Sequence, residues 1–298
     1  MTAPEKILTC SLCPHRCRLA PGQTGFCRAR TNREGTICPD NYGLLTSLAQ
    51  DPIEKKPLRR FHPGSQILSL GSWGCSFRCP FCQNASIAQA GAETARLRLD
   101  PEQLLALALE YREKAGSIGV AFTYNEPLVG YEYVRDCARL LKSHGLATVL
   151  VTNGFLCREP WEKLLPLVDA ANIDLKGFTP EFYRWVGGDL DTVKTNIRLA
   201  VEAGCHVEVT TLVIPGKNDG EEDMKKEAQW LASLSPELPL HISRYFPRWH
   251  LDLPPTPVET VYHLAALARK CTCQQKLDTK LKKSGIKNES MYKIHQLF

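Results

Sequence analysis

Three cysteines lie close together in the stretch GCSFRCPFCQN (74–84). Cys75, Cys79 and Cys82 have the spacing C-x3-C-x2-C, so one loop can direct three thiolates toward one point. A closed zinc site and a ferredoxin-type cluster each use four protein ligands. Three ligands leave one metal position open, and an open position is where a substrate or cofactor binds. The spacing therefore indicates a catalytic metal centre.

This arrangement resembles that of the radical S-adenosylmethionine (SAM) enzymes. The resemblance implies that the three cysteines hold a 4Fe-4S cluster whose fourth iron binds the amino and carboxylate groups of SAM. It also implies reductive cleavage of SAM to methionine and a 5'-deoxyadenosyl radical, which abstracts a hydrogen atom from a substrate. Phe81, directly before the third cysteine, matches the aromatic residue usual there. Two other interpretations stay open: a zinc loop that takes a fourth ligand from elsewhere, and three unpaired thiols.

A second group of cysteines near the N-terminus has the spacing C-x2-C-x3-C-x9-C: Cys10, Cys13, Cys17 and Cys27. Four thiolates in a short segment rich in turn-forming Pro and Gly can surround one tetrahedral ion, and so small a segment needs such a staple to hold its shape. We expect a second metal site that holds zinc or an auxiliary iron-sulfur cluster, with free thiols as the alternative. Cys38 and His15 are possible substitute ligands.

Composition favours a folded protein in a reducing compartment. The chain has 298 residues with 43% apolar content, enough for one large α/β domain or two smaller ones. Thirteen cysteines would suggest disulfides in a secreted protein, but the first residues, MTAPEKILTC, lack the apolar run of a secretory signal. No later segment is apolar for the length of a membrane span. We expect a cytoplasmic protein that does not contact the membrane and whose clustered cysteines bind metal.

The formal net charge of +5 is too small to assign a polyanionic partner. Several arginines gather near the N-terminus: Arg16, Arg18, Arg28, Arg30 and Arg33. A solvated basic face is the preferred interpretation, and nucleic acid is an unfavoured partner, with RNA modification as a minor option.

Six apolar segments have the pattern of buried parallel strands: 66–70, 117–123, 147–152, 170–174, 206–213 and 240–243. Amphipathic segments between and after them predict helices: 101–114, 128–144, 161–167, 191–203, 221–233 and 258–270. This predicts six βα units, fewer than the eight of a closed TIM barrel. The expected fold is α/β, a partial (β/α)6 TIM-like barrel with a Cys-rich N-terminal extension, as the resemblance also implies.

The predicted domains are a Cys-rich extension (1–66) with the possible second metal site, the radical SAM core (67–270) and a Lys-rich tail (271–298). The extension shows little regular pattern. The tail contains Cys271 and Cys273 and has weak apolar periodicity, so it is either a divergent or disordered segment or the product of an altered reading frame.

Parallel sheets of this kind carry their chemistry at the carboxyl ends of the strands. Three motifs follow predicted strands there: TYNEP (123–127), TNGF (152–155) and DLK (174–176). The resemblance implies that their polar side chains bind SAM: Asn125, Glu126, Thr152, Asn153, Asp174 and Lys176. Glu126 is the acceptor for the amino group and Lys176 the partner of the carboxylate. Alternatively, Asn125 caps a helix and Asp174 is a satisfied strand-end carboxylate.

Two positions differ from glycyl-radical-enzyme activases, which also carry TNG and DLK motifs. Val151 stands where they often have an acidic residue, and Phe246 stands where a histidine often follows Tyr245. Both differences remove polar contacts. No catalytic residue is assigned from the sequence.

Five segments agree in order with the AmmeMemoRadiSam-system radical SAM enzymes, which are related to the activases of pyruvate formate-lyase. The segments are CSLCPHRCRLAPGQTGFC, CSFRCPFCQN, FTYNEP, VTNGF and IDLKGF, and the resemblance extends from residue 10 to about residue 270. It implies AMMECR-like and Memo-like protein partners, a flavodoxin- or ferredoxin-type electron donor and a substrate that the sequence does not identify. The alternatives are an activase of a glycyl radical enzyme and a non-catalytic zinc-binding module.

Overall fold

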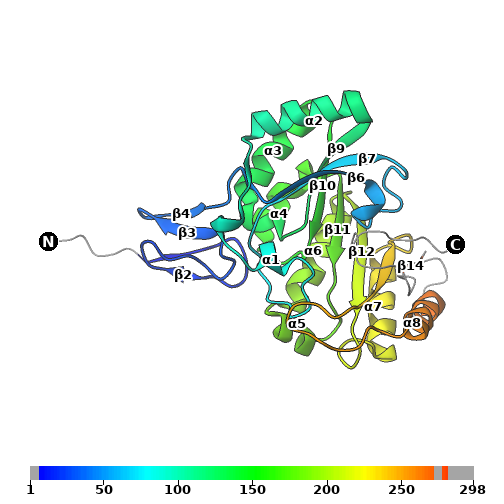
Figure 1. The fold of residues 1–298 in the computed structure, drawn as a ribbon. Helices are drawn as coiled ribbons and strands as arrows, with labels where there is room; N and C mark the ends of the chain where they lie inside the picture. The colour runs from blue at the N-terminus through cyan, green and yellow to red at the C-terminus, as the bar shows by residue number, and fades with distance from the viewer. Residues whose placement is uncertain (1–6, 272–276, 281–298) are drawn as a thin grey trace.

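The computed structural model describes residues 7–271 and 277–280. Its central element is an eight-stranded sheet with the order β14-β13-β12-β11-β10-β9-β7-β6 (Figure 1). The strands are β6 (Ser47–Pro52), β7 (Gln66–Gly71), β9 (Ser117–Phe122), β10 (Ala147–Thr152), β11 (Ala170–Asp174), β12 (His206–Val213), β13 (Leu240–Arg244) and β14 (Leu277–Lys280). In this sheet all neighbouring strands are parallel except β6, which is antiparallel to β7.

Helices connect the parallel strands and pack against the sheet (Figure 1). They are α1 (Ala85–Ala88), α2 (Pro101–Ala115), η3 (Pro127–Gly130), α3 (Tyr131–Ser143), α4 (Arg158–Leu164), η4 (Leu165–Leu167), α5 (Pro180–Val186), α6 (Leu190–Glu202), α7 (Glu221–Leu234) and α8 (Val258–Cys271). All six predicted βα units are therefore present, and the α/β class is confirmed. The parallel sheet is consistent with a partial TIM-like barrel.

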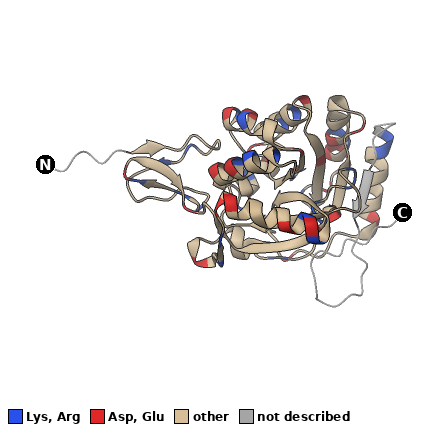
Figure 2. Ribbon diagram, turned by 90° about the horizontal axis from the view of Figure 1, so that it is seen from above, with Lys and Arg blue, Asp and Glu red and all other residues tan. Residues whose placement is uncertain are grey.

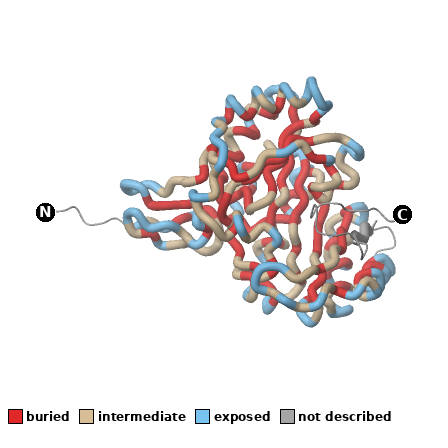
Figure 3. Tube along the Cα trace, in the orientation of Figure 1, coloured by how far each residue is buried: buried red, intermediate tan, exposed pale blue. Residues whose placement is uncertain are grey.

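The helices carry charge on their outer sides and apolar residues toward the sheet. Lys and Arg are interspersed with Asp and Glu along them (Figure 2), and the strands of the central sheet are mostly buried (Figure 3). Leu68, Val149 and Ile242, on three different strands, are fully buried. Within the described chain, none of the helices has the length and the apolar character of a membrane span.

The N-terminal extension contains short strands that the sequence pattern did not predict. They are β1 (Leu8–Thr9), β2 (Arg18–Leu19), β3 (Arg30–Arg33), β4 (Thr36–Pro39) and β5 (Leu44–Leu45). Strands of two to four residues are too short to show an alternating pattern. β6 also lies within the predicted extension, yet it pairs with β7 along its whole length. The central sheet therefore begins before residue 66.

Arg30 is the exception to the predicted solvated basic face, since the other four arginines of that group are exposed. Its guanidinium is buried and donates two hydrogen bonds of 2.7 Å to the carboxylate of Glu132, at the start of α3. Bidentate pairs of this kind fix geometry as well as charge. Arg30 thus anchors the extension to the barrel rather than contributing to a basic surface.

The predicted tail contributes one strand to the sheet. β14 lies parallel to β13, with Leu277 beside Leu240. This strand continues the sheet at the edge opposite β6. Cys273 and the other residues of 272–276, and residues 281–298, lie outside the described residues. The boundaries of the three predicted domains stay predictions.

Gly119 marks the closest approach of β9 and β10. It pairs with Ala147, and a Cβ atom at residue 119 would overlap the carbonyl oxygen and amide nitrogen of that residue. Because these are backbone atoms of a paired strand, they cannot move aside locally. We expect Gly119→Ala to destabilise the fold by about 3 kcal/mol, measured by denaturant unfolding.

Gly116→Ala is the matched control for Gly119→Ala. Gly116 also has a positive φ, +62°, but a Cβ atom there meets nothing within 4 Å. Its cost is the backbone strain of alanine in the left-handed region, about 1 kcal/mol. Equal unfolding midpoints for the two variants would show that β9 and β10 do not approach as closely as described.

Candidate active site

A cavity of about 350 Å³ lies within the barrel and opens at the carboxyl ends of the parallel strands. It is lined by the three cysteines of the 74–84 loop and by polar residues that follow β9, β10 and β11: Cys75, Cys79, Cys82, Asn125, Glu126, Asn153, Asp174 and Lys176. The structure therefore brings together residues that the sequence separates by up to about 100 positions. Of the predicted SAM contacts, Thr152 is the one that is not part of this lining.

Backbone donors point at the sulfurs of the cysteine loop. The amide of Phe77 donates to Cys75 Sγ at 3.3 Å, and the amide of Asn84 donates to the sulfur of Cys82. The side-chain amide of Asn153 also lies 3.7 Å from Cys75 Sγ. Such donors stabilise thiolates, which are the form that binds metal.

Burial raises the pKa of all three thiols, and that of Cys79 rises to about 12. Without a metal, these cysteines are therefore protonated at neutral pH. Metal binding must displace their protons, so the affinity of the loop for metal increases with pH.

Asn125 holds the cysteine loop in place. Its side-chain amide donates to the carbonyl oxygens of Trp73 and Gly74, each at 3.1 Å, and its oxygen accepts from the amide of Ser72. The sequence predicted Asn125 as a SAM contact. In the structure its hydrogen-bonding groups are directed at the backbone that leads into Cys75, so it positions the cysteine loop.

Glu126 is a buried carboxylate with three hydrogen-bond donors. It accepts from Thr152 Oγ1 at 2.7 Å, from the Asn153 amide at 2.7 Å and from the Leu128 amide at 3.0 Å. Burial raises its pKa to about 7, although these hydrogen bonds oppose the shift. Thr152 thus lies behind Glu126 and orients it. Glu126 itself faces the cavity and can receive a cation.

Lys176 and Asp174 form an ion pair in the cavity wall, with Lys176 Nζ 2.7 Å from Asp174 Oδ2. Burial alone would lower the pKa of Lys176, but the charge of Asp174 and the hydrogen bond to it outweigh burial, so the pKa is raised. Lys176 therefore stays charged near Cys79 and can bind a carboxylate. Asp174 orients this ammonium group.

The cavity wall also contains the two positions at which this sequence has an apolar residue where glycyl-radical-enzyme activases often have a polar one. Val151 and Phe246 both line the cavity, and the guanidinium of Arg244 lies 4.9 Å from the centre of the Phe246 ring. Phe81 packs against Trp185 of α5, with ring centroids 5.5 Å apart, and is 4% exposed. It thereby anchors the cysteine loop between Cys79 and Cys82.

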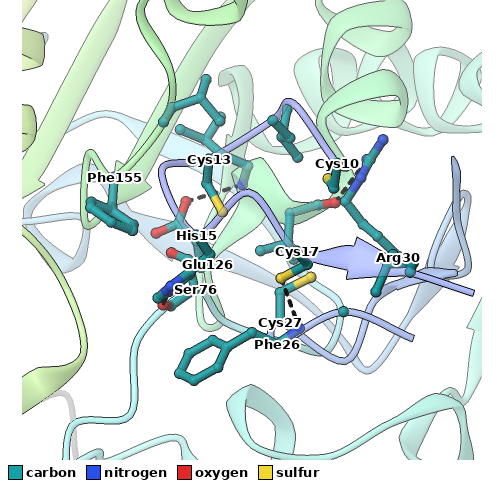
Figure 4. A pocket seen from close by; sticks show the side chains of 16 residues that line it. Cys10, Cys13, His15, Cys17, Phe26, Cys27, Arg30, Ser76, Glu126 and Phe155 are labelled. Carbon is teal, nitrogen blue, oxygen red and sulfur yellow. Dashed lines mark hydrogen bonds between the residues drawn. The ribbon is translucent and has the colours of Figure 1, made fainter. Parts of the chain in front are cut away.

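The four N-terminal cysteines line a second, smaller cavity of about 20 Å³ (Figure 4). The amide of Phe26 donates to Cys17 Sγ at 3.4 Å, and the amides two residues after Cys13 and Cys27 donate to those sulfurs. These donors repeat the pattern of the 74–84 loop. His15 lines this cavity, whereas Cys38, the other possible substitute ligand, is not part of its lining.

The extension touches the cysteine loop directly. The amide of Cys75 donates to the carbonyl oxygen of Cys27 at 3.2 Å, and His15 Nε2 donates to the carbonyl oxygen of Ser76 at 2.7 Å. Gly74 permits this approach, because a Cβ atom there would overlap the Cys27 carbonyl. Glu126 lines both cavities, so the two cavities adjoin at this side chain.

Within residues 7–271 and 277–280, no three His, Cys, Asp or Glu side chains are gathered tightly enough to share one metal ion. An iron-sulfur cluster distributes its cysteines over separate irons, so it does not require that arrangement. The residues around the large cavity fit a cluster with bound SAM by their chemistry. They supply three thiols with amide donors, a carboxylate for an ammonium group and an ammonium group for a carboxylate.

Four basic residues in the cavity wall were not predicted as site residues: Lys55, Lys56, Arg244 and Arg248. The two lysines were grouped with the extension, because the sequence pattern did not show that β6 joins the sheet. Arg244 is the last residue of β13. Its position at the carboxyl end of a strand could have identified it as a candidate site residue.

The sequence matches the model of the radical SAM superfamily over residues 72–228. It is 41% identical over 256 residues to an uncharacterised protein of Methanocaldococcus jannaschii, covering 85% of this chain and 75% of that one. It is 29% identical over 167 residues to the pyruvate formate-lyase 1-activating enzyme of Escherichia coli K12. That alignment covers 54% of this chain and 65% of the enzyme, so the chain spans less than two thirds of it.

Two solved structures share the fold. A radical SAM methyltransferase from Sphaerobacter thermophilus superposes with a TM-score of 0.56 at 17% identity, covering 74% of this chain and 68% of that one. Streptococcus suis SuiB bound to S-adenosylmethionine gives a TM-score of 0.56 at 13% identity, covering 73% and 52%. Since the family model spans more than half of the sequence, the chain belongs to the radical SAM superfamily and is related to the pyruvate formate-lyase activating enzymes.

Proposed function

We propose that this radical SAM enzyme abstracts a hydrogen atom from a substrate that its sequence does not identify, as an enzyme of the AmmeMemoRadiSam type. One observation carries the proposal: the three cysteines of the 74–84 loop line the same cavity as Glu126 and Lys176. When bound there, a reduced cluster would supply an electron that cleaves SAM to methionine and a 5'-deoxyadenosyl radical.

The residues of this chain have distinct roles in the proposal. Cys75, Cys79 and Cys82 hold the cluster. Glu126 binds the amino group of SAM, and Lys176 binds its carboxylate, because each side chain carries the complementary charge within the cavity wall. The polar end of SAM is thereby held beside the cysteine loop.

Anaerobic reconstitution with iron and sulfide, followed by dithionite and SAM, tests this function. We expect 5'-deoxyadenosine and methionine in equal amounts, detected by liquid chromatography and mass spectrometry. A chain that binds iron but releases neither product would contradict the proposal. A colourless chain that binds only zinc would support the non-catalytic zinc module instead.

The assignment to the AmmeMemoRadiSam type is supported by the five sequence segments, all of which lie around the two cavities or lead into them. We infer AMMECR-like and Memo-like proteins as partners and a flavodoxin or ferredoxin as the electron donor. Co-purification of tagged chain with co-encoded proteins tests these partners. We further infer a cytoplasmic location, since the cysteines whose side chains the structure describes form no disulfide with one another.

Activation of a glycyl radical enzyme is the second candidate function. It is favoured by the similarity to the Escherichia coli activating enzyme. An activase must leave a radical on a glycine of its partner protein. Electron paramagnetic resonance after incubation with a co-encoded candidate partner therefore separates the two functions, because a small-molecule enzyme produces no glycyl signal.

The N-terminal cysteines are proposed to form a second metal site. All four line one cavity (Figure 4), and the sulfurs of Cys13, Cys17 and Cys27 accept backbone amides. Among the described residues, these four sulfurs do not lie close enough together to bind one metal ion. The three sulfurs of the 74–84 loop do not either. Zinc and an auxiliary cluster both fit this donor set.

Cys13→Ala tests the second site, with Cys38→Ala as the control. We expect Cys13→Ala to lose either one zinc ion per chain or the iron of an auxiliary cluster, measured by inductively coupled plasma mass spectrometry. Cys38→Ala should keep the full metal content, because Cys38 lies outside the cavity. Equal metal content in wild type and Cys13→Ala would mean that the four cysteines are free thiols.

A further inference from the structure

Two lysines lie at the end of the large cavity away from the cysteine loop. Lys55 ends the short helix η1 (Ile53–Lys55), and Lys56 follows it; both line the cavity. η1 comes directly after β6, whose last residue pairs with Gln66, the first residue of β7. The cysteine loop instead follows Gly71, the last residue of β7. The backbones of the lysine pair and of the cysteine loop therefore lie at opposite ends of β7, while Lys56 Nζ reaches to 4.7 Å from the ring of Tyr124.

The lysine pair carries more positive charge than its protein partner neutralises. Lys55 Nζ lies 2.9 Å from Asp51 Oδ1, and Lys56 Nζ lies 2.8 Å from Asp51 Oδ2. The hydroxyl of Tyr124 also donates to Asp51 Oδ2, at 2.7 Å. One carboxylate thus serves two ammonium groups. Asp51 is not part of the cavity lining, so the lysines and Tyr124 lie between it and the cavity.

Burial of Lys56 raises the free-energy cost of this excess positive charge. The side chain of Lys56 is 2% exposed, and burial lowers its pKa, although Asp51 opposes the shift. A buried ammonium group without a full counter-charge is unfavourable, and a protein keeps one mainly where it binds something. Lys56 also lies 4.7 Å from the ring of Tyr124, whose φ of +71° is in the strained left-handed region. Such strain is concentrated at functional sites.

The acidic groups in the cavity wall are already engaged. Glu126 accepts three hydrogen bonds at the loop end, and Asp174 pairs with Lys176. They are the two acids in the lining, which also contains five Lys and Arg residues. Neither acid has an ion pair with Lys55 or Lys56 among the described salt bridges. The positive charge of the lysine pair that Asp51 does not neutralise can therefore be balanced by an anion that enters the cavity from solution.

We propose that Lys55 and Lys56 bind the carboxylate or phosphate group of a small anionic substrate and hold its carbon skeleton toward the SAM end of the cavity. This inference rests on the proposed function, since it names the substrate class of the same site. It disfavours an exposed glycine loop of a partner protein as the substrate, because a backbone glycine brings no negative charge to the lysine pair.

The test measures binding of acetate and inorganic phosphate to the reconstituted full chain, by isothermal titration calorimetry without reductant. We expect saturable binding of at least one probe, and the tighter probe indicates whether the substrate carries a carboxylate or a phosphate. Lys55→Met and Lys56→Met should each weaken binding at least tenfold, because each removes one ammonium group. Lys56→Arg should bind within threefold of wild type and shows that loss of charge, not misfolding, is measured.

Lys114→Met is the control, because Lys114 lies on α2 with a side chain that is 72% exposed and should not affect anion binding. SAM affinity should stay within threefold of wild type in all four variants. Absence of saturable binding by wild type, or equal losses in Lys56→Met and Lys114→Met, would overturn the proposal. So would a parallel loss of SAM affinity in Lys56→Met, which would assign the pair to SAM. Anion binding requires no SAM cleavage, so its failure is distinguishable from failure of the proposed function.

Discussion

Replacement of Cys79 by alanine should abolish reductive cleavage of SAM. Cys79 is the central cysteine of the loop and is 8% exposed. With it removed, the loop supplies only two thiols, and within the described residues no other Cys lines the cavity. Loss of groups that merely support metal ligands costs 10- to 100-fold. We expect loss of the ligand itself to lower 5'-deoxyadenosine formation by more than about 100-fold.

The iron content and visible absorption of Cys79→Ala should fall together with its activity. Cys205→Ala is the matched control, because Cys205 is also buried but precedes β12 and does not line the cavity. This variant should keep both iron and activity. If Cys79→Ala still binds a cluster and cleaves SAM at a comparable rate, the three cysteines of the loop are not the ligands.

The sheet could be predicted because its parallel strands are buried on both faces. Segments such as ATVLVT (147–152) are continuous apolar runs, and Asp100 with Pro101 marks the start of α2 clearly. The structure shows the cap: the Asp100 side chain accepts from the Gln103 amide, which completes a capping box. Local chemistry was sufficient for these elements, because each segment carries its own periodic pattern or cap.

β6 could not be predicted, because its sequence lacks the local pattern that identified the other strands. Its sequence, SLAQDP, contains Gln50, Asp51 and Pro52, which are uncommon in strands. Asp51 is nevertheless buried, because its charge is balanced by lysines that follow it in the chain and by Tyr124, 73 residues away. That balance depends on tertiary contacts. The lysine pair was missed for the same reason.

The residues of the candidate site were predicted as a set, but the sequence could not show which of them line the cavity and which lie behind those residues. Glu126 and Lys176 line the cavity as expected, and Asn125 lines it while also holding the cysteine loop, whereas Thr152 lies behind Glu126. A motif places residues at the end of a strand, but which side chains reach the cavity depends on hydrogen bonds between strands. Thr152 and Glu126 illustrate this, since they belong to different βα units.

Replacement of Glu126 by glutamine should weaken SAM binding by about 10- to 100-fold at pH 7.5. A hydrogen bond to a charged group contributes about 1.5–3 kcal/mol, and each 1.4 kcal/mol changes affinity tenfold. Glutamine keeps the shape of the side chain but loses the charge. Glu159→Gln, at a side chain that is 79% exposed on α4, is the control and should bind SAM as wild type does. Equilibrium dialysis with labelled SAM measures the difference, and thermal unfolding shows whether both variants are folded.

The pH dependence of SAM binding separates a loss of charge from a loss of packing. Burial raises the pKa of Glu126 to about 7, so the carboxylate is ionised above that pH and increasingly neutral below it. An ammonium ligand binds the ionised form, so wild-type affinity should fall as the pH is lowered, by about tenfold between pH 7 and 5.5. Proton release from the SAM amino group on binding iron adds the same slope to wild type and variant, so the difference between the two profiles reports Glu126. Glu126→Gln should lose about tenfold less affinity than wild type over this interval, because its side chain does not titrate. Equal slopes in the two proteins would show that a different group binds the amino end of SAM.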